Sequence, residues 1–465
     1  MVDLVVAGGT VVTPTGVERA DVVVDGERIV GLDAGRERAG ARRVIDADGR
    51  IVLPGGVDVH THFLIGFMGQ RSVYDFTSGT QAALRGGTTT VVDFALQRRG
   101  RGLMDGLKHR RVQADRRVAT DYGLHLIVTD VNAATLAELP RVVEAGVTSI
   151  KCYMVYEQEQ LRVSDGALLD LMAAAGRLGM IVGVHAENAD VIDRRVAAAL
   201  AAGEVAPRHH AATRPPVSEA EAISRALLFA EDAGCAAYVF HLALGAGVDA
   251  IARARARGVR AFAETCTHYL ALDRSAYERP DASLYVMSPP LRTADDQRLL
   301  WAGLRDATLA GVASDDASYS AAMKRSVDAS FDKIPNGVPG VEHRLPVLYT
   351  LGVAQGRLSL ADLAEVFSTR PASLFGLAPR KGAIVAGADA DLVVIDPQTR
   401  RPVRADDQFG PLGYSPYEGM ELSGWPVATV RRGAVCAEAG TVTAAEGDGR
   451  FLERTLPDTT LPARR

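Results

Sequence analysis

The chain has 465 residues, of which 47% are hydrophobic and 23% are charged, proportions that are ordinary for a soluble globular enzyme. This length is too great for one small core and predicts one large domain or two. The 52 basic and 57 acidic residues leave a net charge of −5, which gives no indication of a nucleic-acid partner or of an anionic membrane.

Membrane-spanning and secreted proteins are also disfavoured. No apolar run approaches the roughly 18–20 residues needed to span a bilayer. The N-terminal sequence "MVDLVVAGGTVVTPTG" lacks the basic region and the long apolar stretch of a signal peptide. The four cysteines lie far apart and form no CxxC pair. We therefore expect a reduced, cytoplasmic protein without disulfides.

Both ends of the chain have the pattern of short β-strands. Residues 1–53 contain apolar runs separated by Gly, Asp and Pro, without a helical period. The same pattern returns within residues 376–440, in "GAIVAGADADLVVIDP" and "PVATVRRGAVCAEAGTV". We expect these two segments to form one small β-sandwich domain, followed by a tail over residues 441–465.

The middle of the chain, residues 54–375, alternates β-rich runs with helical segments, which is typical of parallel β/α units. Eight such units predict a (β/α)8 barrel. One intervening helix begins with Ser218 and Glu221 in the spacing of a capping box, and Gly234 suits its end. The eight β-rich runs are residues 52–63, 88–96, 122–130, 147–156, 180–188, 236–244, 259–270 and 310–317.

Potential metal ligands recur at the ends of these runs. In a (β/α)8 barrel, the chemistry takes place at the C-terminal ends of the strands. Only ten histidines occur in the chain, and four of them fall at these ends. A lone histidine there is more often a packed side chain than a ligand, and an aspartate usually caps the next helix. All six residues at one rim favour a metal site: His60, His62, Lys151, His185, His241 and Asp315.

Lys151 is the misfit of the apolar run "SIKCYMVY". Taken alone, it would most simply extend its amine to the barrel mouth. Burial and nearby cations, however, lower the pKa of a lysine and leave a neutral amine that can react with CO2. The resulting carbamate has two oxygens, and each of them can bind one metal ion. We therefore expect Lys151 to be carboxylated.

The predicted site holds two divalent metal ions. His60 and His62, which are i and i+2 on one strand, point to the same face and would bind the first ion with Asp315. His185 and His241 would bind the second ion, and carboxylated Lys151 and a hydroxide would bridge the two. The site keeps a net positive charge, which favours an ionised bridging water near neutral pH.

These motifs resemble those of the cyclic amidohydrolases, specifically the dihydropyrimidinase/hydantoinase branch. The resemblance covers nearly the whole chain and rests on segments that include "LPGGVDVHTH", "SIKCYMVY", "HAEN", "FAETCTHYL", "SPPLR", "ASDD" and "IPNGVPGVEHRLPVLY". It implies a (β/α)8 barrel and hydrolytic opening of a dihydropyrimidine or a 5-substituted hydantoin to an N-carbamoyl amino acid. It also implies a bridging hydroxide, the six metal ligands above and carboxylation of Lys151.

The resemblance assigns further roles. Asp315 would transfer protons between the attacking hydroxide and the ring nitrogen, and Tyr156 would stabilise the oxyanion. The backbones at Ser288 and Asn336 would bind the –CO–NH–CO– edge of the substrate, although turn chemistry beside Pro and Gly is the simpler interpretation of these two residues alone. Zinc is the expected metal, with manganese or cobalt as alternatives. A homotetramer or homodimer is implied as well.

Several positions depart from the family pattern. The usual His and Cys after the metal aspartate are Asp316 and Ala317, and Glu157 and Gln160 follow the oxyanion tyrosine. Gln70 replaces a usual Thr. These changes predict a more polar mouth and leave an allantoinase-like activity, or one on another cyclic amide or imide, open. A catalytically silent scaffold is a further alternative, which the complete ligand set disfavours.

Overall fold

The computed structural model describes residues 2–33, 35, 38–326 and 330–460. Eight parallel strands form one sheet, in the order β15-β14-β13-β12-β11-β10-β9-β6. An isolated parallel bridge between Thr61 and Asp316 brings the first and last strands together, so the barrel is nearly closed. The strands are β6 (Gly56–Thr61), β9 (Thr88–Leu96), β10 (Asp121–Ile127), β11 (Ser149–Tyr153), β12 (Ile181–His185), β13 (Ala236–Val239), β14 (Ala261–Cys266) and β15 (Gly311–Ala313).

Helices surround this barrel, as the alternating pattern predicts. The longer ones are α1 (Phe76–Arg85), α2 (Leu103–Ala114), α3 (Ala133–Glu144), α4 (Asp165–Arg177), α5 (Ala189–Ala201), α7 (Pro216–Ala233), α8 (Gly245–Ala256) and α10 (Ala294–Arg305). Shorter helices are α6 (His210–Thr213), α9 (Thr267–Ala271), α11 (Ala321–Ser326), α12 (Arg344–Leu348), α13 (Leu360–Ala364) and α14 (Arg370–Leu374). The (β/α)8 prediction is confirmed.

The strands are buried on both faces because helices cover the outside and side chains fill the inside. On β9, Val91 joins the core beneath the helices, whereas Val92 and Phe94 join the cluster inside the barrel. Of the residues of β9, only Leu96 is exposed. This double burial explains why the barrel strands are near-continuous apolar runs in the sequence.

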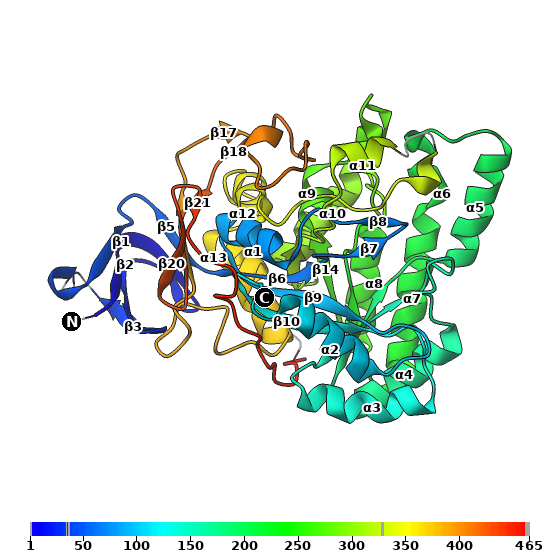
Figure 1. Cartoon of the computed structure of the whole chain (residues 1–465), viewed down its shortest axis with the longest axis horizontal. Coiled ribbons are helices and arrows are strands. Elements are labelled where there is room, and N and C mark those ends of the chain that lie inside the picture. Colours follow the sequence, from blue (N-terminus) through cyan, green and yellow to red (C-terminus); the bar gives the residue numbers. More distant parts are fainter. Residues whose placement is uncertain (1, 34, 36–37, 327–329, 461–465) are drawn as a thin grey trace.

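A second, mixed sheet joins the two ends of the chain beside the barrel (Figure 1). Apolar side chains from both chain ends, among them Leu4 and Val430, meet in one separate cluster, which confirms a small β-domain built from both ends. We propose residues 53 and 375 as its boundaries with the barrel. Its strands are β1 (Leu4–Thr13), β2 (Gly16–Asp25), β3 (Arg28–Asp33), β4 (Arg43–Asp46), β5 (Ile51–Pro54), β16 (Leu392–Asp396), β19 (Trp425–Arg431), β20 (Ala434–Glu438) and β21 (Thr441–Val442).

Two of the predicted elements differ in detail from the structure. The capping box at Ser218 and Glu221 is wrong, because α7 begins earlier, at Pro216, where the ring already fixes a helical φ. Ser218 lies inside the first turn and donates its hydroxyl to the Pro215 carbonyl (2.7 Å). Gly234 does end this helix, with φ of 61°. The run 259–270 also divides, since β14 stops at Cys266 and α9 follows.

The C-terminal tail crosses the N-terminal ends of two barrel strands. The Leu452 amide donates to the Tyr122 carbonyl on β10 (2.7 Å). Arg454, which is buried, donates to the Ser149 hydroxyl at the start of β11 (2.9 Å). The tail thus covers the end of the barrel opposite the predicted site.

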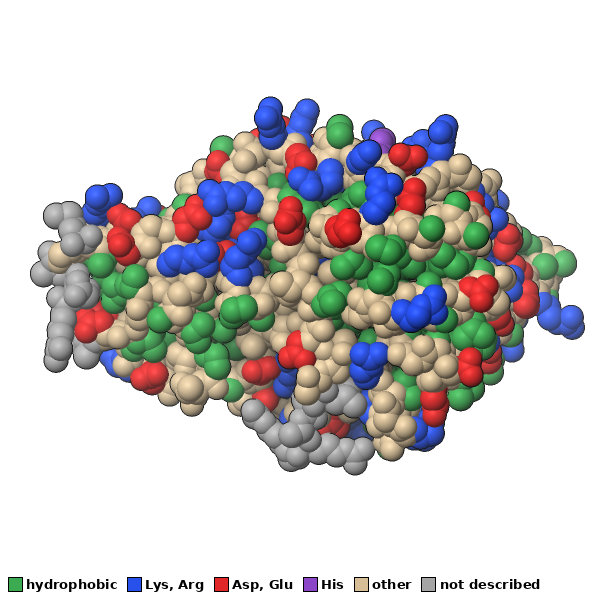
Figure 2. Space-filling view, turned by 90° about the horizontal axis from the view of Figure 1, so that it is seen from below, with side chains coloured by type: hydrophobic (Ala, Val, Ile, Leu, Met, Phe, Trp, Pro, Cys, Tyr) green, Lys and Arg blue, Asp and Glu red, His purple; other side chains and the backbone are tan. Residues whose placement is uncertain are grey.

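The surface carries mixed charge, and on the face in Figure 2 basic and acidic side chains are interspersed. None of the helices that the structure describes combines the length and the apolar character that crossing a bilayer requires. All four cysteines are buried free thiols.

A buried lysine joins the barrel to the segment that leads into β16. Lys381 Nζ lies 2.7 Å from a carboxylate oxygen of Asp121, 2.9 Å from one of Asp389 and 2.8 Å from one of Asp391. Burial by itself would raise the pKa of Asp121, but the charges of Lys381 and Arg432 lower it below its usual value. Without Lys381, the three carboxylates would remain buried but would lack this shared cation.

Lys381→Met is expected to lower the free energy of unfolding by about 3–5 kcal/mol, because it removes the buried cation that contacts all three buried carboxylates. The carboxylate contribution is present above about pH 4 and is lost as pH falls through the lowered pKa of Asp121. The gap to wild type in urea midpoints should therefore be large at pH 7 and shrink in acid. Lys333→Met, which removes an exposed ion pair with Asp332, is the control. Equal midpoints for both variants would contradict this account.

Candidate active site

The six predicted ligand residues converge at the C-terminal end of the barrel. The neighbours of Lys151 on β11, Ile150 and Cys152, face the helices, so Lys151 itself points inward. His60 lies on β6 and His185 ends β12. His62, His241 and Asp315 lie directly beyond their strands, β6, β13 and β15.

His60, His62 and Asp315 form a compact group whose ligand atoms all lie within 4.8 Å of one another. His60 Nε2 is 3.2 Å from His62 Nε2 and 3.0 Å from an Asp315 carboxylate oxygen. Burial lowers the pKa of His62 to about 4, and the two histidines hold the pKa of Asp315 well below its usual range despite burial. A neutral imidazole and an ionised carboxylate are the forms that bind a metal ion. This group fits a divalent metal ion.

Lys151 is 1% exposed, and its Nζ lies 2.9 Å from His60 Nε2. The rings of Phe94 and Phe240 face the amine, with centroids 4.4 and 4.7 Å away. Among the described residues, no carboxylate oxygen comes within 4.0 Å of Nζ, so the usual ion pair of a buried lysine is missing here. Burial lowers the pKa of Lys151 to about 8. A neutral amine is therefore accessible near neutral pH.

His185 and His241 form a second pair, with ring centroids 4.5 Å apart. Nε2 of His185 lies 2.7 Å from a Glu187 carboxylate oxygen, and Glu187 in turn accepts from Arg214 at 2.5 Å. Burial lowers the pKa of both histidines. His241 Nδ1 is buried and lacks a hydrogen-bond partner among the described residues. A buried imidazole nitrogen without a hydrogen-bond partner is consistent with a histidine whose ring binds a metal ion.

The sequence reasoning missed two buried carboxylates that orient these histidines. Glu264, on β14, hydrogen-bonds His60 Nδ1 and accepts from the Tyr238 hydroxyl (2.8 Å). Glu187 does the same for His185. Such carboxylates fix the ring orientation and raise the basicity of the nitrogen that faces the metal. The available signal was a fully buried acidic residue inside the run "FAETC", the same kind of misfit as Lys151.

Three of the predicted site residues have left-handed backbone conformations. The φ angles are 69° at Tyr156, 40° at His241 and 47° at Asp315. Such angles are uncommon for residues other than glycine and are concentrated at functional sites. In each case the chain turns sharply just beyond a barrel strand, which directs the side chain to the cavity.

An inner cavity opens above these ligands. Tyr156, Ser288 and Asn336 line it, together with Lys151, His185, His241 and Asp315. Burial raises the pKa of Tyr156, so its phenol stays protonated and can donate a hydrogen bond. The structure thus brings all nine predicted site residues together, with His60 fully buried beneath the cavity wall.

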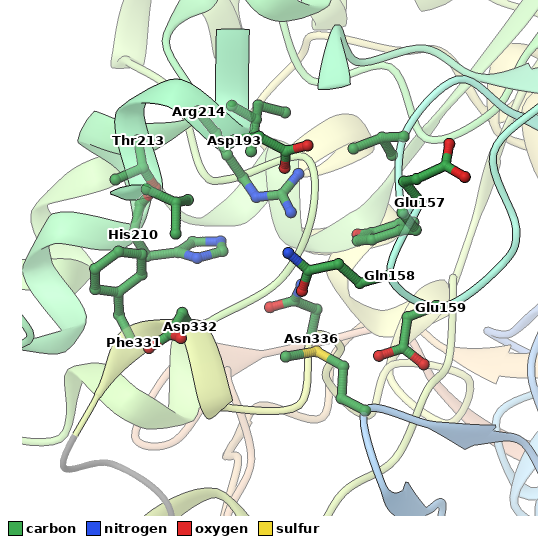
Figure 3. A pocket seen from close by; sticks show the side chains of 15 residues that line it. Glu157, Gln158, Glu159, Asp193, His210, Thr213, Arg214, Phe331, Asp332 and Asn336 are labelled. Carbon is green, nitrogen blue, oxygen red and sulfur yellow. The ribbon is translucent and has the colours of Figure 1, made fainter. Parts of the chain in front are cut away.

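An outer pocket adjoins the inner cavity and shares Tyr156 and Asn336 with it. Figure 3 shows the side chains of Gln158, Arg214 and Asn336 turned toward its middle. Glu157, one of the departures from the family pattern, lines this pocket, but its carboxylate points away from the middle. The outer pocket is therefore rich in polar groups.

The remaining departures lie at different depths. Asp316 is buried and accepts the Gly340 amide (2.8 Å) and the Val341 amide (3.1 Å), so it fixes a loop behind the site. Ala317 lines the inner cavity. Gln160 is exposed, and Gln70 belongs to the short strand β8 (Gln70–Arg71).

Buried side chains hold the irregular segment that carries Ser288. Lys324 donates to the Val286 carbonyl (2.7 Å), and His210 Nε2 lies 2.8 Å from the Met287 carbonyl oxygen. The Tyr269 hydroxyl donates to the Pro289 carbonyl (2.7 Å). Since a buried segment outside a helix or sheet must find other hydrogen-bond partners, these side chains fix the backbone on both sides of Ser288.

The chain is similar to known proteins over nearly its whole length. The model of the amidohydrolase family matches residues 51–436. The chain is 40% identical over 453 residues to a D-hydantoinase from Geobacillus stearothermophilus, covering 97% of this chain and 96% of that one, and 40% identical to a D-hydantoinase from Rhizobium radiobacter, covering 97% and 99%. The crystal structure of dihydropyrimidinase from Brevibacillus agri has a TM-score of 0.95 at 39% identity, over 97% of this chain and 99% of that one. The chain therefore belongs to the amidohydrolase family, in its hydantoinase and dihydropyrimidinase branch.

Proposed function

We propose that this protein hydrolyses a cyclic amide or imide ring, a dihydropyrimidine or a 5-substituted hydantoin, to an N-carbamoyl amino acid. The observation that carries the proposal is the complete set of ligand side chains around one cavity, in a chain 40% identical to D-hydantoinases over 97% of its length. A small-molecule substrate suits a cavity that lies inside the barrel mouth.

Two divalent metal ions would be held by the six ligand residues. His60, His62 and Asp315 would hold one ion, and His185 and His241 the other, with Lys151 as a carbamate between them. Bound there, the ions would lower the pKa of water and polarise the ring carbonyl. The mixed imidazole and carboxylate donors suit zinc, and manganese or cobalt are the alternatives.

Carboxylation of Lys151 would give this lysine a negative charge that can bind metal ions beside the histidines. The pKa of about 8 leaves part of the amine neutral at pH 7–8, which is the form that reacts with CO2. The carbamate would then place one negative charge among the four histidines. Lys151 Nζ is buried beside His60 and does not extend to solvent, which supports the modification.

The chain's own groups account for proton transfer and charge stabilisation. Asp315 is ionised and can accept a proton from the attacking water, then deliver it to the departing ring nitrogen. The Tyr156 phenol can donate a hydrogen bond to the oxyanion as it forms. The backbones at Ser288 and Asn336 would hold the –CO–NH–CO– edge, so that the ring carbonyl faces Asp315 and Tyr156.

Lys324→Met is expected to raise KM about five- to tenfold with little change in kcat, because it removes one hydrogen bond from the segment that carries Ser288. Lys324 is fully buried and contacts this segment through the Val286 carbonyl. Steady-state kinetics on the best hydantoin, with metal content measured in parallel, would check this. A fall in kcat with unchanged KM would contradict the assignment.

The proposed function is tested by a hydrolysis screen on metal-replete protein with hydantoins, dihydrouracil, allantoin and cyclic imides. We expect turnover of hydantoins or dihydrouracil, with ring opening verified by mass spectrometry. Turnover of allantoin alone would favour the allantoinase-like alternative, to which the polar outer pocket lends support. Protein that binds neither metal nor CO2 would indicate a catalytically silent scaffold.

A cytoplasmic location and a homotetramer or homodimer complete the proposal. The four buried free thiols support a reducing compartment. Light scattering of the purified protein would give its oligomeric state.

A further inference from the structure

Tyr319 is a buried tyrosine in the wall of the inner cavity whose hydroxyl has no assigned role. It follows Asp315 by four residues and lines the cavity together with Tyr156 and Lys151. Its side chain is fully buried, and its hydroxyl has no hydrogen-bond partner among the described residues. A buried hydroxyl without a partner costs free energy, so its presence calls for an explanation.

Three other buried tyrosines have hydrogen-bond partners for their hydroxyls. Tyr238 donates to Glu264 (2.8 Å), Tyr269 donates to the Pro289 carbonyl (2.7 Å), and the Tyr277 hydroxyl accepts the Leu291 amide (3.0 Å). These hydroxyls hold the protein's own groups in place. Tyr319 differs from them because its unpartnered hydroxyl belongs to a residue that lines the inner cavity, where a ligand can supply the missing acceptor.

The charges that act on this hydroxyl come from both the inner cavity, through Asp315, and the outer pocket, through Glu159. Burial raises its pKa, and the charges of Tyr156, Glu159 and Asp315 act in the same direction. The hydroxyl therefore stays protonated and is available as a donor. Glu159 lines the outer pocket, where Gln158 and Arg214 also present polar groups (Figure 3). A ring substituent that points toward the outer pocket would therefore contact polar side chains.

We propose that Tyr319 is a specificity-determining residue, whose hydroxyl donates a hydrogen bond to an acceptor atom on the ring substituent. The substrates it favours are cyclic amides with a hydroxyl, carbonyl or ureido group close to the ring, in preference to purely apolar substituents of the same size. This inference rests on the proposed ring hydrolysis and names the class of substituent for that same site.

The test compares two hydantoins of matched size, 5-(hydroxymethyl)hydantoin and 5-ethylhydantoin, on wild type and Tyr319→Phe. We expect the variant to lose about two- to tenfold in kcat/KM on the hydroxymethyl compound, the range of one neutral hydrogen bond, with most of the change in KM. Its kcat/KM on the ethyl compound should stay unchanged. The preference for the polar substituent should therefore shrink or vanish.

Tyr414→Phe is the matched control, because Tyr414 also has a buried hydroxyl without a partner but does not line the inner cavity. It should leave both rates unchanged. A second readout is thermal stability, for which Tyr319→Phe should match or exceed wild type because no hydrogen bond of the free protein is lost. Tyr277→Phe, which removes a bonded hydroxyl, should melt at a lower temperature.

Each other outcome overturns the proposal in a recognisable way. Equal losses on both hydantoins, or a lower melting temperature for Tyr319→Phe, would mean that the hydroxyl has a structural partner such as a bound water. Turnover of both rings with an unchanged preference would reject the role of Tyr319 and leave the proposed function intact. Turnover of neither ring by wild type, together with a negative hydrolysis screen, would reject both.

Discussion

Lys151→Ala is expected to lose bound metal and to fall at least about 10³-fold in kcat, a loss comparable with removal of a catalytic group. The alanine removes the nitrogen on which the bridging carbamate would form and leaves a cavity beside His60, with no anion between the two groups of histidines. Metal analysis of the purified variant and its rate on the best ring substrate would measure both effects.

Chemical rescue makes this prediction specific. A short-chain acid such as acetate or propionate can enter the space left by the side chain and offer two carboxylate oxygens, so it should restore part of both metal content and rate. Lys324→Met is the matched control: it removes another fully buried lysine, which contacts the Val286 carbonyl instead of the histidines, and it should keep its metal. A Lys151→Ala protein that kept its metal and its rate without added acid would exclude the carbamate.

Asp315→Asn is expected to lower kcat by about 10³–10⁴-fold, with a smaller change in KM, because an amide can neither accept the proton of the attacking water nor deliver it to the ring nitrogen. The low pKa of Asp315, caused by His60 and His62, keeps this carboxylate ionised and ready to accept. The variant should retain its fold, since asparagine has nearly the same shape.

Asp316→Asn separates catalysis from loop support. Asp316 is the neighbouring buried carboxylate, but it accepts the Gly340 and Val341 amides, and the oxygen of an asparagine can still accept them. We expect less than about a tenfold loss in kcat for this variant, the cost of weakening one hydrogen-bonded network. Similar losses for the two variants would show that Asp315 has no special part in proton transfer.

Much of the barrel was predictable because its strands are buried on both faces and read as apolar runs. The run 88–96 coincides with β9, seven of the eight runs contain a whole barrel strand, and the run 122–130 lacks only the first residue of β10. The errors lie where two local rules compete. Ser218 and Glu221 have capping spacing, but Pro216 two residues earlier already starts the helix, and the apolar run 259–270 hides the change from β14 to α9.

The site was predictable to the extent that its residues violate local expectation. A lysine in an apolar strand and a His-Thr-His pair at a strand end can both be recognised from the sequence alone. Glu264 is visible there too, but its partner is not, because His60 lies 204 residues away in the chain. Glu187, by contrast, lies only two residues from its partner His185. Tyr319 gives no local signal at all, since a tyrosine between serines after an aspartate pair is ordinary in a loop.

The order of the residues alone determined the barrel, the joint domain of the two chain ends and the side chains that are candidates for metal ligands, because periodicity and misplaced charge are properties of neighbouring residues. Only the tertiary structure decided which carboxylates orient which histidines, which side chains fix the backbone around Ser288, and that the Tyr319 hydroxyl lacks a partner at the cavity. Those facts depend on distances between strands and loops far apart in the chain. Hydrogen bonding and desolvation act over a few ångströms of space, whatever the separation along the sequence.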